Sequence, residues 1–228
     1  MIREFASDIA YTFFPPVCLG CLGVLACDPH AVFCRECRNQ ITFLTGGHCP
    51  VCGMIFPDSP SGDHLCGSCI EQRPWFTQAR SAVAFDGIIL EAIHSFKYGR
   101  STITGDRLAG FLADYDFTDM DWRHFDCILP VPLHIRRLRE RRFNQSLILA
   151  RALGRKHKLP VDFSLLKRRR FTSTQTGLDK NEREKNMKSA FEIVHPERLA
   201  GQHVILVDDV FTTGATTNEC ARALKKAG

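Results

Sequence analysis

Residues 203–217 read HVILVDDVFTTGATT: a short apolar run, two adjacent acids, and a loop rich in threonine and glycine. The apolar run has the length of a buried strand, and residues 215–226 continue with helical spacing. Backbone N–H groups at the start of a helix form a positive concavity that binds anions such as phosphate. The stretch therefore predicts a phosphate site between the end of a buried strand and the start of a helix.

The individual residues of this stretch fit the same interpretation. Gly214 permits a positive φ and a close approach of the backbone to a ligand. Asp208 and Asp209 can accept hydrogen bonds from ribose hydroxyls and lie near a magnesium ion held by phosphate oxygens. The threonine hydroxyls supply further donors. The predicted ligand contacts are Asp208, Asp209, Thr212, Thr213, Gly214, Ala215 and Thr216.

Residues 74–228 alternate expected strands with expected helices. The helices are expected over residues 87–98, 104–115, 145–153 and 215–226, and the strands over residues 81–85, 126–132 and 203–207. Asn144 is a suitable N-cap for the third helix, which Gly154 and Pro160 are expected to end. This alternation predicts an α/β fold with a parallel sheet covered by helices on both faces.

Eight of the eleven cysteines form four CxxC pairs, all before residue 70. The pairs are Cys18/Cys21, Cys34/Cys37, Cys49/Cys52 and Cys66/Cys69. Repeated pairs indicate metal ligands in a reducing compartment, and two pairs complete a tetrahedral four-thiolate zinc site. A redox function is the weaker alternative, because one catalytic pair would suffice.

Four pairs predict two structural Zn²⁺ ions, and both a sequential and an interleaved pairing fit the sequence. Residues 1–73 are therefore expected to form a small zinc module ahead of the α/β domain, with the metal replacing a core that so short a segment lacks. Three cysteines outside the pattern are expected to be structural, and three nearby histidines to be ordinary loop residues. These are Cys27, Cys127, Cys220, His30, His48 and His64.

Positive charge is concentrated in one segment. Residues 136–170 carry 13 Lys or Arg against Glu140 and Asp162, a net charge of +11 in a chain whose total is +5. Such a surface suits a polyanion, either nucleic acid or a ligand that carries a pyrophosphate, although solvated helix faces give the same composition. No apolar run approaches the length of a membrane span, so a cytoplasmic protein is expected.

The segment 204–216 resembles the phosphoribosyl-pyrophosphate (PRPP) motif of type I phosphoribosyltransferases. The chain as a whole resembles the competence protein F (ComF) family, a double zinc ribbon followed by a phosphoribosyltransferase-like domain. The matching segments are the four CxxC pairs, His94–Tyr98, Pro130–Leu133, Arg142–Ser146, Gln175, Arg183–Asn186, Ala190–Phe191 and the PRPP loop. Relatives usually continue through another short strand, which this chain, ending at Gly228, is expected to lack.

The resemblance implies PRPP binding with Mg²⁺ and an accessory role in DNA uptake during natural transformation. Single-stranded DNA and proteins of the competence machinery are then the expected partners. A true phosphoribosyltransferase acting on an unidentified base or amine in nucleotide metabolism is the alternative. Neither function assigns a catalytic residue here.

The resemblance also implies further ligand contacts. The loop from Pro130 to Arg142 takes the place of a pyrophosphate-contacting loop, and residues 172–188 resemble a mobile loop that closes over the reaction centre. The candidates are Lys97, Arg136, Arg137, Arg141, Arg142, Gln175, Arg183, Lys185 and Asn186. Trp75 and Trp122 could stack on bases, but core or boundary positions explain them more simply.

Overall fold

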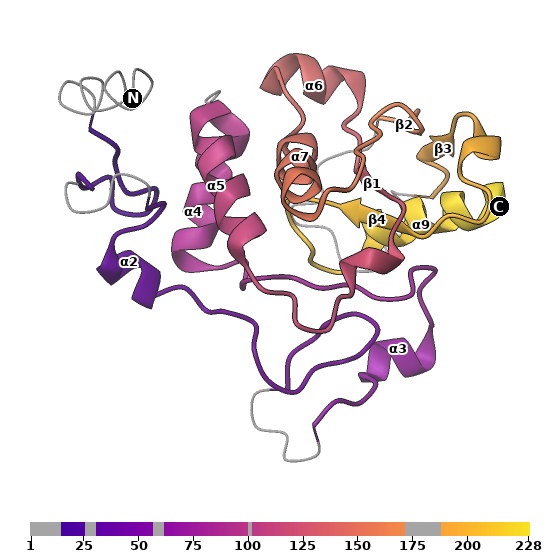
Figure 1. The fold of residues 1–228 in the computed structure, drawn as a ribbon, viewed down its shortest axis with the longest axis horizontal. Helices are drawn as coiled ribbons and strands as arrows, with labels where there is room; N and C mark the ends of the chain where they lie inside the picture. Colours follow the sequence, from indigo (N-terminus) through magenta and orange to yellow (C-terminus); the bar gives the residue numbers. More distant parts are fainter. Residues whose placement is uncertain (1–14, 26–30, 57–61, 100–101, 172–187) are drawn as a thin grey trace.

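The computed structural model describes residues 15–25, 31–56, 62–99, 102–171 and 188–228. At its centre lies a parallel pair of strands, β1 (Cys127–Pro130) and β4 (Val204–Val207). Their register pairs Cys127 with Val204 and Pro130 with Val207 (Figure 1). Val161 adds an isolated parallel bridge to Ile128, on β1.

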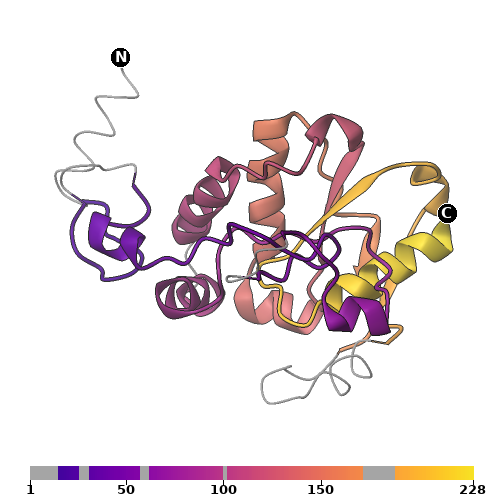
Figure 2. The same ribbon diagram turned by 90° about the horizontal axis from the view of Figure 1, so that it is seen from below.

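Helices cover both faces of this sheet. Alternate side chains of the strands point to opposite sides, as strand geometry requires. Ile128 packs in one cluster with α4 (Gly87–Tyr98), α5 (Thr102–Asp114) and α7 (Gln145–His157), whereas Leu129 packs in another with α9 (Ala215–Ala227). Figure 2 shows α4, α5 and α7 on one side of the strands and α9 on the other. The predicted α/β architecture is confirmed.

The predicted end of α7 is wrong. Gly154 lies inside the helix, which continues to His157 and ends at Lys158 in the left-handed conformation. A Cβ atom on Gly154 would lie 2.6 Å from a methyl of Val161 and 2.8 Å from the carbonyl oxygen of Leu159. This glycine therefore makes room for the returning chain rather than ending the helix.

The strand expected over residues 81–85 is also wrong. Val83 forms only an isolated antiparallel bridge with Phe43, from the cysteine-rich segment, and the parallel sheet does not include it. Hydrogen bonds from Leu44 N to Ala82 O and from Ala84 N to Thr42 O complete this short contact. The alternating sequence thus joins the N-terminal segment to the α/β body.

The remaining described elements are short. They are α2 (Arg35–Asn39), α3 (Gly67–Glu71), η1 (Trp122–His124), α6 (Ile135–Arg141), β2 (Leu166–Arg168), β3 (Phe191–Ile193) and η2 (Pro196–Arg198). β2 and β3 pair antiparallel. No helix in the described ranges is long and apolar enough to cross a bilayer.

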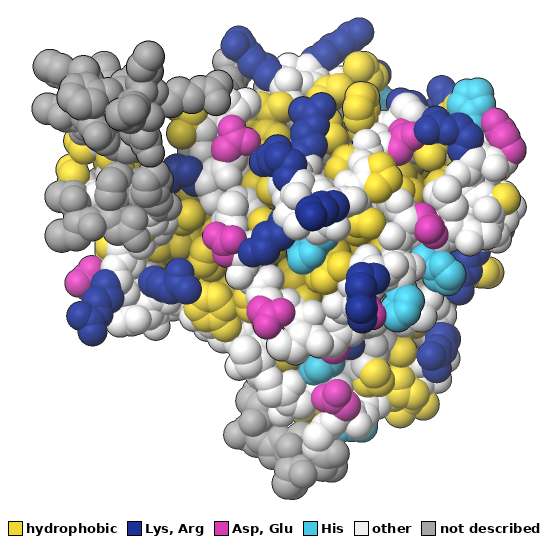
Figure 3. All heavy atoms as spheres, in the orientation of Figure 1, with side chains coloured by type: hydrophobic (Ala, Val, Ile, Leu, Met, Phe, Trp, Pro, Cys, Tyr) yellow, Lys and Arg dark blue, Asp and Glu magenta, His cyan; other side chains and the backbone are white. Residues whose placement is uncertain are grey.

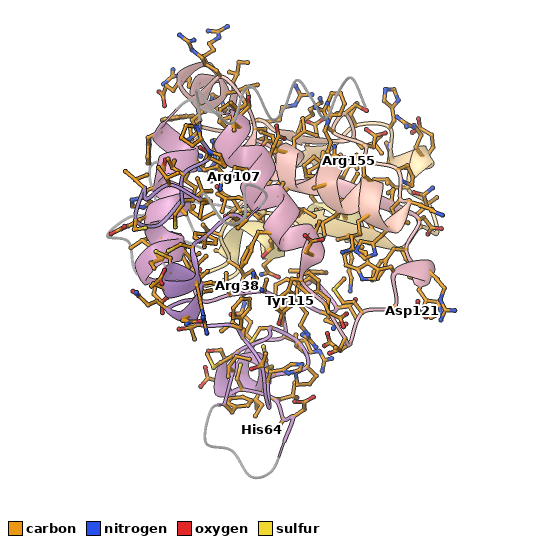
Figure 4. All side chains as sticks on the ribbon, turned by 60° about the vertical axis from the view of Figure 1, so that its left-hand side comes forward. Arg38, His64, Arg107, Tyr115, Asp121 and Arg155 are labelled. Atoms are coloured by element: carbon orange, nitrogen blue, oxygen red, sulfur yellow. The ribbon has the colours of Figure 1, made fainter. Side chains whose placement is uncertain are left out.

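The first cysteine segment shares the main core, and the second has a core of its own. Cys18 and Cys37 pack in the same cluster as α4, α5 and α7. Arg107 on α5 fastens this segment by donating to the carbonyl oxygens of Val17 at 2.6 Å and Ala31 at 2.5 Å (Figure 4). The second segment packs mainly around its own cysteines and forms the lobe that carries the labelled His64.

Candidate phosphate-binding site and metal centres

Two carboxylates follow directly from the end of β4. Asp208 Oδ1 accepts hydrogen bonds from the Ser146 hydroxyl at 3.0 Å and from the Asp209 backbone N–H at 2.9 Å. Burial of the carboxyl group, and then the charge of Asp209, raise the pKa of Asp208 to about 7. The two acids therefore lie just beyond the carboxyl end of β4, and α/β folds bind ligands at the carboxyl ends of their parallel strands.

A lysine from a distant part of the chain reaches the second acid. Lys97 on α4 places its Nζ atom 3.1 Å from Asp209 Oδ2, and both side chains are largely buried. The same ammonium group lies 5.8 Å from the centre of the Phe85 ring. The structure thus brings the predicted residue Lys97 to the acid pair.

A small hollow opens beside the acids, at the start of α9. It is lined by Asp208, Val210, Phe211, Thr212, Gly214, Ala215, Thr216 and Thr217. Gly214 is the N-cap of α9 with φ at +72°, as expected for the loop. Because the first N–H groups of this 13-residue helix have no partner within the helix, the hollow can bind a phosphate group.

Asp208 also lies within electrostatic reach of an arginine, Arg168, which two further arginines influence. Arg168 on β2 is mostly buried, and burial, followed by the charge of Arg137, lowers its pKa to about 10. Arg141 and Asp208 also act on Arg168 electrostatically. Like charges brought together in a partly buried place favour an anion between them. In Figure 3, Lys and Arg side chains gather over α6 and α7.

A buried amide adjoins the same group of arginines. Gln145, the first residue of α7, is 1% exposed, and its Oε1 accepts a hydrogen bond from Arg141 at 3.3 Å. Its side-chain NH₂ group has no hydrogen-bond partner among the residues that the structure describes. A buried donor of this kind costs free energy unless a ligand or water accepts its hydrogen bond.

The other predicted basic contacts are exposed or lie outside the described residues. Arg136 lies over the Phe171 ring, 5.1 Å from its centre, and Arg142 is exposed at the C-cap of α6. Arg183 and Lys185, with the rest of the expected mobile loop up to residue 187, fall outside the described residues. Trp122 stacks on His157 at 3.6 Å, which agrees with a boundary position.

Sequence reasoning gave no role to Arg168, Gln145 or Ser146. The last two lie in a segment that carries the family resemblance, and Asn144 just before them caps α7 as predicted. Arg168 had no local signal, because a run of four basic residues does not reveal which one is turned inward. Only the pairing of β2 with β3 places it there.

The eight paired cysteines form two groups of four. The sulfur atoms within each group all lie within 4.8 Å of one another. The groups are Cys18, Cys21, Cys34 and Cys37, and Cys49, Cys52, Cys66 and Cys69. This is the sequential pairing. Tetrahedral zinc with Zn–S bonds of about 2.3 Å requires sulfurs about 3.8 Å apart, and Cys21 and Cys34 lie 3.8 Å apart.

Backbone amides surround one sulfur of the first group. The N–H groups of Gly20 and Cys34 point to Cys18 Sγ at 3.3 and 3.2 Å. Burial opposes ionisation of this thiol, but the backbone donors outweigh it and lower the pKa of Cys18 to about 6. Cys49 has the same environment in the second group, and its pKa is also lowered to about 6. Both groups fit structural zinc sites.

Comparisons with known proteins agree with this arrangement. A family model described as a double zinc ribbon domain matches residues 9–75. Competence protein F of Haemophilus influenzae is 30% identical over 221 residues, which cover 95% of this chain and 93% of that protein. DNA utilization protein YhgH of Escherichia coli (strain K12) is 31% identical over 94% of this chain and 92% of its own length. Competence protein ComFC of Bacillus subtilis is 28% identical over 88% of this chain and 80% of its own length.

Proposed function

Because the chain belongs to the competence protein F family, we propose that it binds PRPP with Mg²⁺ and acts as an accessory protein in DNA uptake. The proposed division is a zinc module over residues 1–73 and a phosphoribosyltransferase-like domain over residues 74–228. Eight thiolate ligands remain reduced in the cytoplasm, which is the proposed location.

One observation carries the proposal for PRPP. Asp208 and Asp209 follow β4 beside a hollow at the start of α9, and the charge of Asp208 acts on Arg168 together with those of Arg137 and Arg141. A 5-phosphate fits the hollow, ribose hydroxyls fit the acids, and a diphosphate fits the arginines. Mg²⁺ prefers carboxylate and phosphate oxygens, so the acid pair would hold it against the diphosphate.

The surface next to this site supports DNA as a partner. Arg136 and Arg137 lie over the Phe171 ring at 5.1 and 5.9 Å, and Arg141 lies 5.6 Å from the centre of the Tyr98 ring. Phe171 is 43% exposed and Tyr98 is 67% exposed. Exposed aromatic rings among arginines bind single strands, because the rings stack on bases while the cations hold the backbone.

Calorimetry with PRPP and Mg²⁺ tests the first part of the proposal. The zinc-loaded wild type is expected to bind PRPP, and the double variant Asp208→Asn, Asp209→Asn is expected to lose binding. A wild type that does not bind PRPP contradicts the proposal. Zinc content and circular dichroism of both proteins show whether the fold is retained.

Two further measurements distinguish an accessory function in DNA uptake from a phosphoribosyltransferase activity. An accessory binds single-stranded oligonucleotides with an affinity that falls steeply with salt and is lost in a Phe171→Ala, Tyr98→Ala variant. A transferase instead consumes PRPP and releases pyrophosphate only when one base or amine is added. Acceptor-dependent release of pyrophosphate without affinity for DNA would favour the transferase.

A further inference from the structure

An aromatic contact links the second cysteine group to the loop of residues 210–214, here called the phosphate loop, which joins Asp209 to α9. Phe76 packs on the cluster that contains the buried residues Cys49 and Cys66. The centre of its ring also lies 6.0 Å from that of Phe211, in an edge-to-face arrangement. Phe76 therefore contacts a metal centre on one side and the loop after Asp209 on the other.

Phe211 in turn fits closely against the turn that opens the loop. A Cβ atom on Gly214 would lie 2.8 Å from the Phe211 ring and 3.6 Å from the Phe76 ring. The space beside this positive-φ residue is thus filled by the two rings. A shift of Phe76 would free Phe211 and change the position of the backbone N–H groups that face the hollow.

A hydrogen bond next to Phe76 fixes the same junction. The backbone N–H of Trp75 donates to Asn218 Oδ1 at 2.6 Å, in the first turns of α9. Further along the chain, the Ala79 N–H donates to the carbonyl oxygen of Val51 at 2.7 Å. Val51 lies between two cysteines of the second group in the sequence. The chain from 75 to 79 therefore joins the metal-binding turn to the helix that forms the phosphate site.

The core of the second lobe is small. Among the residues that the structure describes there, the buried side chains are three cysteines and Val51. A lobe of this kind depends on its metal for a fixed shape, because few apolar contacts remain without it. The position of Phe76 then depends on the metal as well.

We propose that metal in the second cysteine group positions the phosphate loop through Phe76, so that zinc and a phosphate ligand each strengthen the binding of the other. The inference rests on the proposed phosphate site and adds to it a regulator, the occupancy of one of the two metal centres. Coupling between two sites is reciprocal. A phosphate ligand must therefore raise the affinity of the second group for zinc. We expect this gain to appear as slower loss of zinc from the second group and unchanged loss from the first, which lies beyond α4 and α5 (Figure 1).

The test is the rate of zinc release from the full zinc-loaded chain into a colorimetric chelator, with and without ribose 5-phosphate. This probe reaches the loop and does not need Mg²⁺. We expect one of two release phases to slow about fivefold or more at saturation, which is the usual range of coupling between sites. Phe76→Ala should abolish the protection and weaken binding of ribose 5-phosphate in calorimetry, and Phe76→Leu should restore part of both.

Phe56 gives the matched control. It packs on the same cysteine cluster, but its ring stacks on His64 at 3.9 Å rather than on the phosphate loop. Phe56→Ala should speed the release phase of the second group, which identifies that phase, and leave the protection by ligand intact. Phe211→Leu repeats the test from the loop side, because Phe211 packs on Phe76 and is not itself part of the cysteine cluster.

Two results would contradict the inference in different ways. If ribose 5-phosphate binds but protects both zinc ions equally or neither, the coupling is absent and the proposed phosphate site stands. If neither ribose 5-phosphate nor PRPP binds the intact zinc-loaded protein, the proposed function is itself wrong, and the coupling falls with it.

Discussion

The ammonium group of Lys97 lies 3.1 Å from Asp209 Oδ2, which joins α4 to the acid pair at the end of β4. These residues are 112 positions apart in the sequence. The lysine balances the charge of one of the two adjacent acids. In the proposed complex with PRPP and Mg²⁺, the magnesium ion would compete with this lysine for the carboxylate.

We expect Lys97→Met to lower the free energy of unfolding by about 1–3 kcal/mol, because it leaves a largely buried carboxylate without its cation. Lys97→Arg keeps the charge and should retain most of the stability. Urea denaturation of the zinc-loaded proteins measures both. Equal midpoints for the wild type and Lys97→Met would mean that the ion pair contributes little.

The acid pair also predicts how stability depends on pH. Because the folded chain keeps a proton on Asp208 up to about pH 7, whereas an unfolded chain releases it near pH 4, the contribution of this group falls as pH rises between those values. Asp208→Asn carries no such proton. It should therefore be more stable than the wild type at about pH 8, and the difference should shrink toward about pH 5.

Ser146→Ala is the opposite control for this pH dependence. The Ser146 hydroxyl donates to Asp208 and so favours the charged carboxylate. Its removal should raise the pKa of Asp208 further, so the decline in stability should continue to a higher pH and be larger in total. The free energy of unfolding of each protein is measured by denaturation at several pH values. If it depends on pH in the same way for Asp208→Asn as for the wild type, the raised pKa of Asp208 is contradicted.

Arg168 offers a separate test of the diphosphate end of the site. Arg168→Met should weaken PRPP binding roughly 10- to 100-fold, since a hydrogen bond to a charged group contributes about 1.5–3 kcal/mol. Binding of ribose 5-phosphate should be nearly unchanged, because that ligand lacks the diphosphate. Calorimetry with the two ligands separates these effects.

The neighbouring Arg169 is the matched control for Arg168. It is exposed and pairs with Glu192 at 2.6 Å on the surface. Arg169→Met removes the same charge from the chain and should leave the affinities for PRPP and for ribose 5-phosphate unchanged. An equal loss in the two variants would indicate a general electrostatic effect rather than a contact at the site.

Two helix glycines should respond in opposite ways to the same substitution. Gly154→Ala places a methyl group against Val161 and the Leu159 carbonyl, and should destabilise the fold by about 1–3 kcal/mol through overpacking. A Cβ atom on Gly110 in α5 would meet no neighbouring atom of the described residues within 4 Å, so Gly110→Ala should stabilise by about 0.5–1 kcal/mol. Thermal or urea denaturation compares the two, and stabilisation by Gly154→Ala would show that the helix end relaxes freely.

Much of the fold could be predicted from local patterns. α4 has the predicted bounds, α9 begins at the predicted Ala215, and Asn144 caps α7. The pattern failed at Gly154, because a glycine that ends a helix and one that admits a neighbouring chain look alike in sequence. It failed again over residues 81–85, where alternation indicated a strand but the available partner was one short segment of the cysteine-rich region.

The sequence alone determined the chemistry that the protein can use: four pairs of thiols, a pair of acids after an apolar strand, and a threonine-rich loop that begins a helix. Spacing along the chain fixes these, because each depends on neighbours a few residues away. Only the tertiary structure decided that thiol pairs combine sequentially, that Lys97 meets Asp209, that Arg168 turns inward, and that Phe76 joins a metal centre to the phosphate loop. Those contacts join residues far apart in the chain, and they depend on how helices and strands pack together.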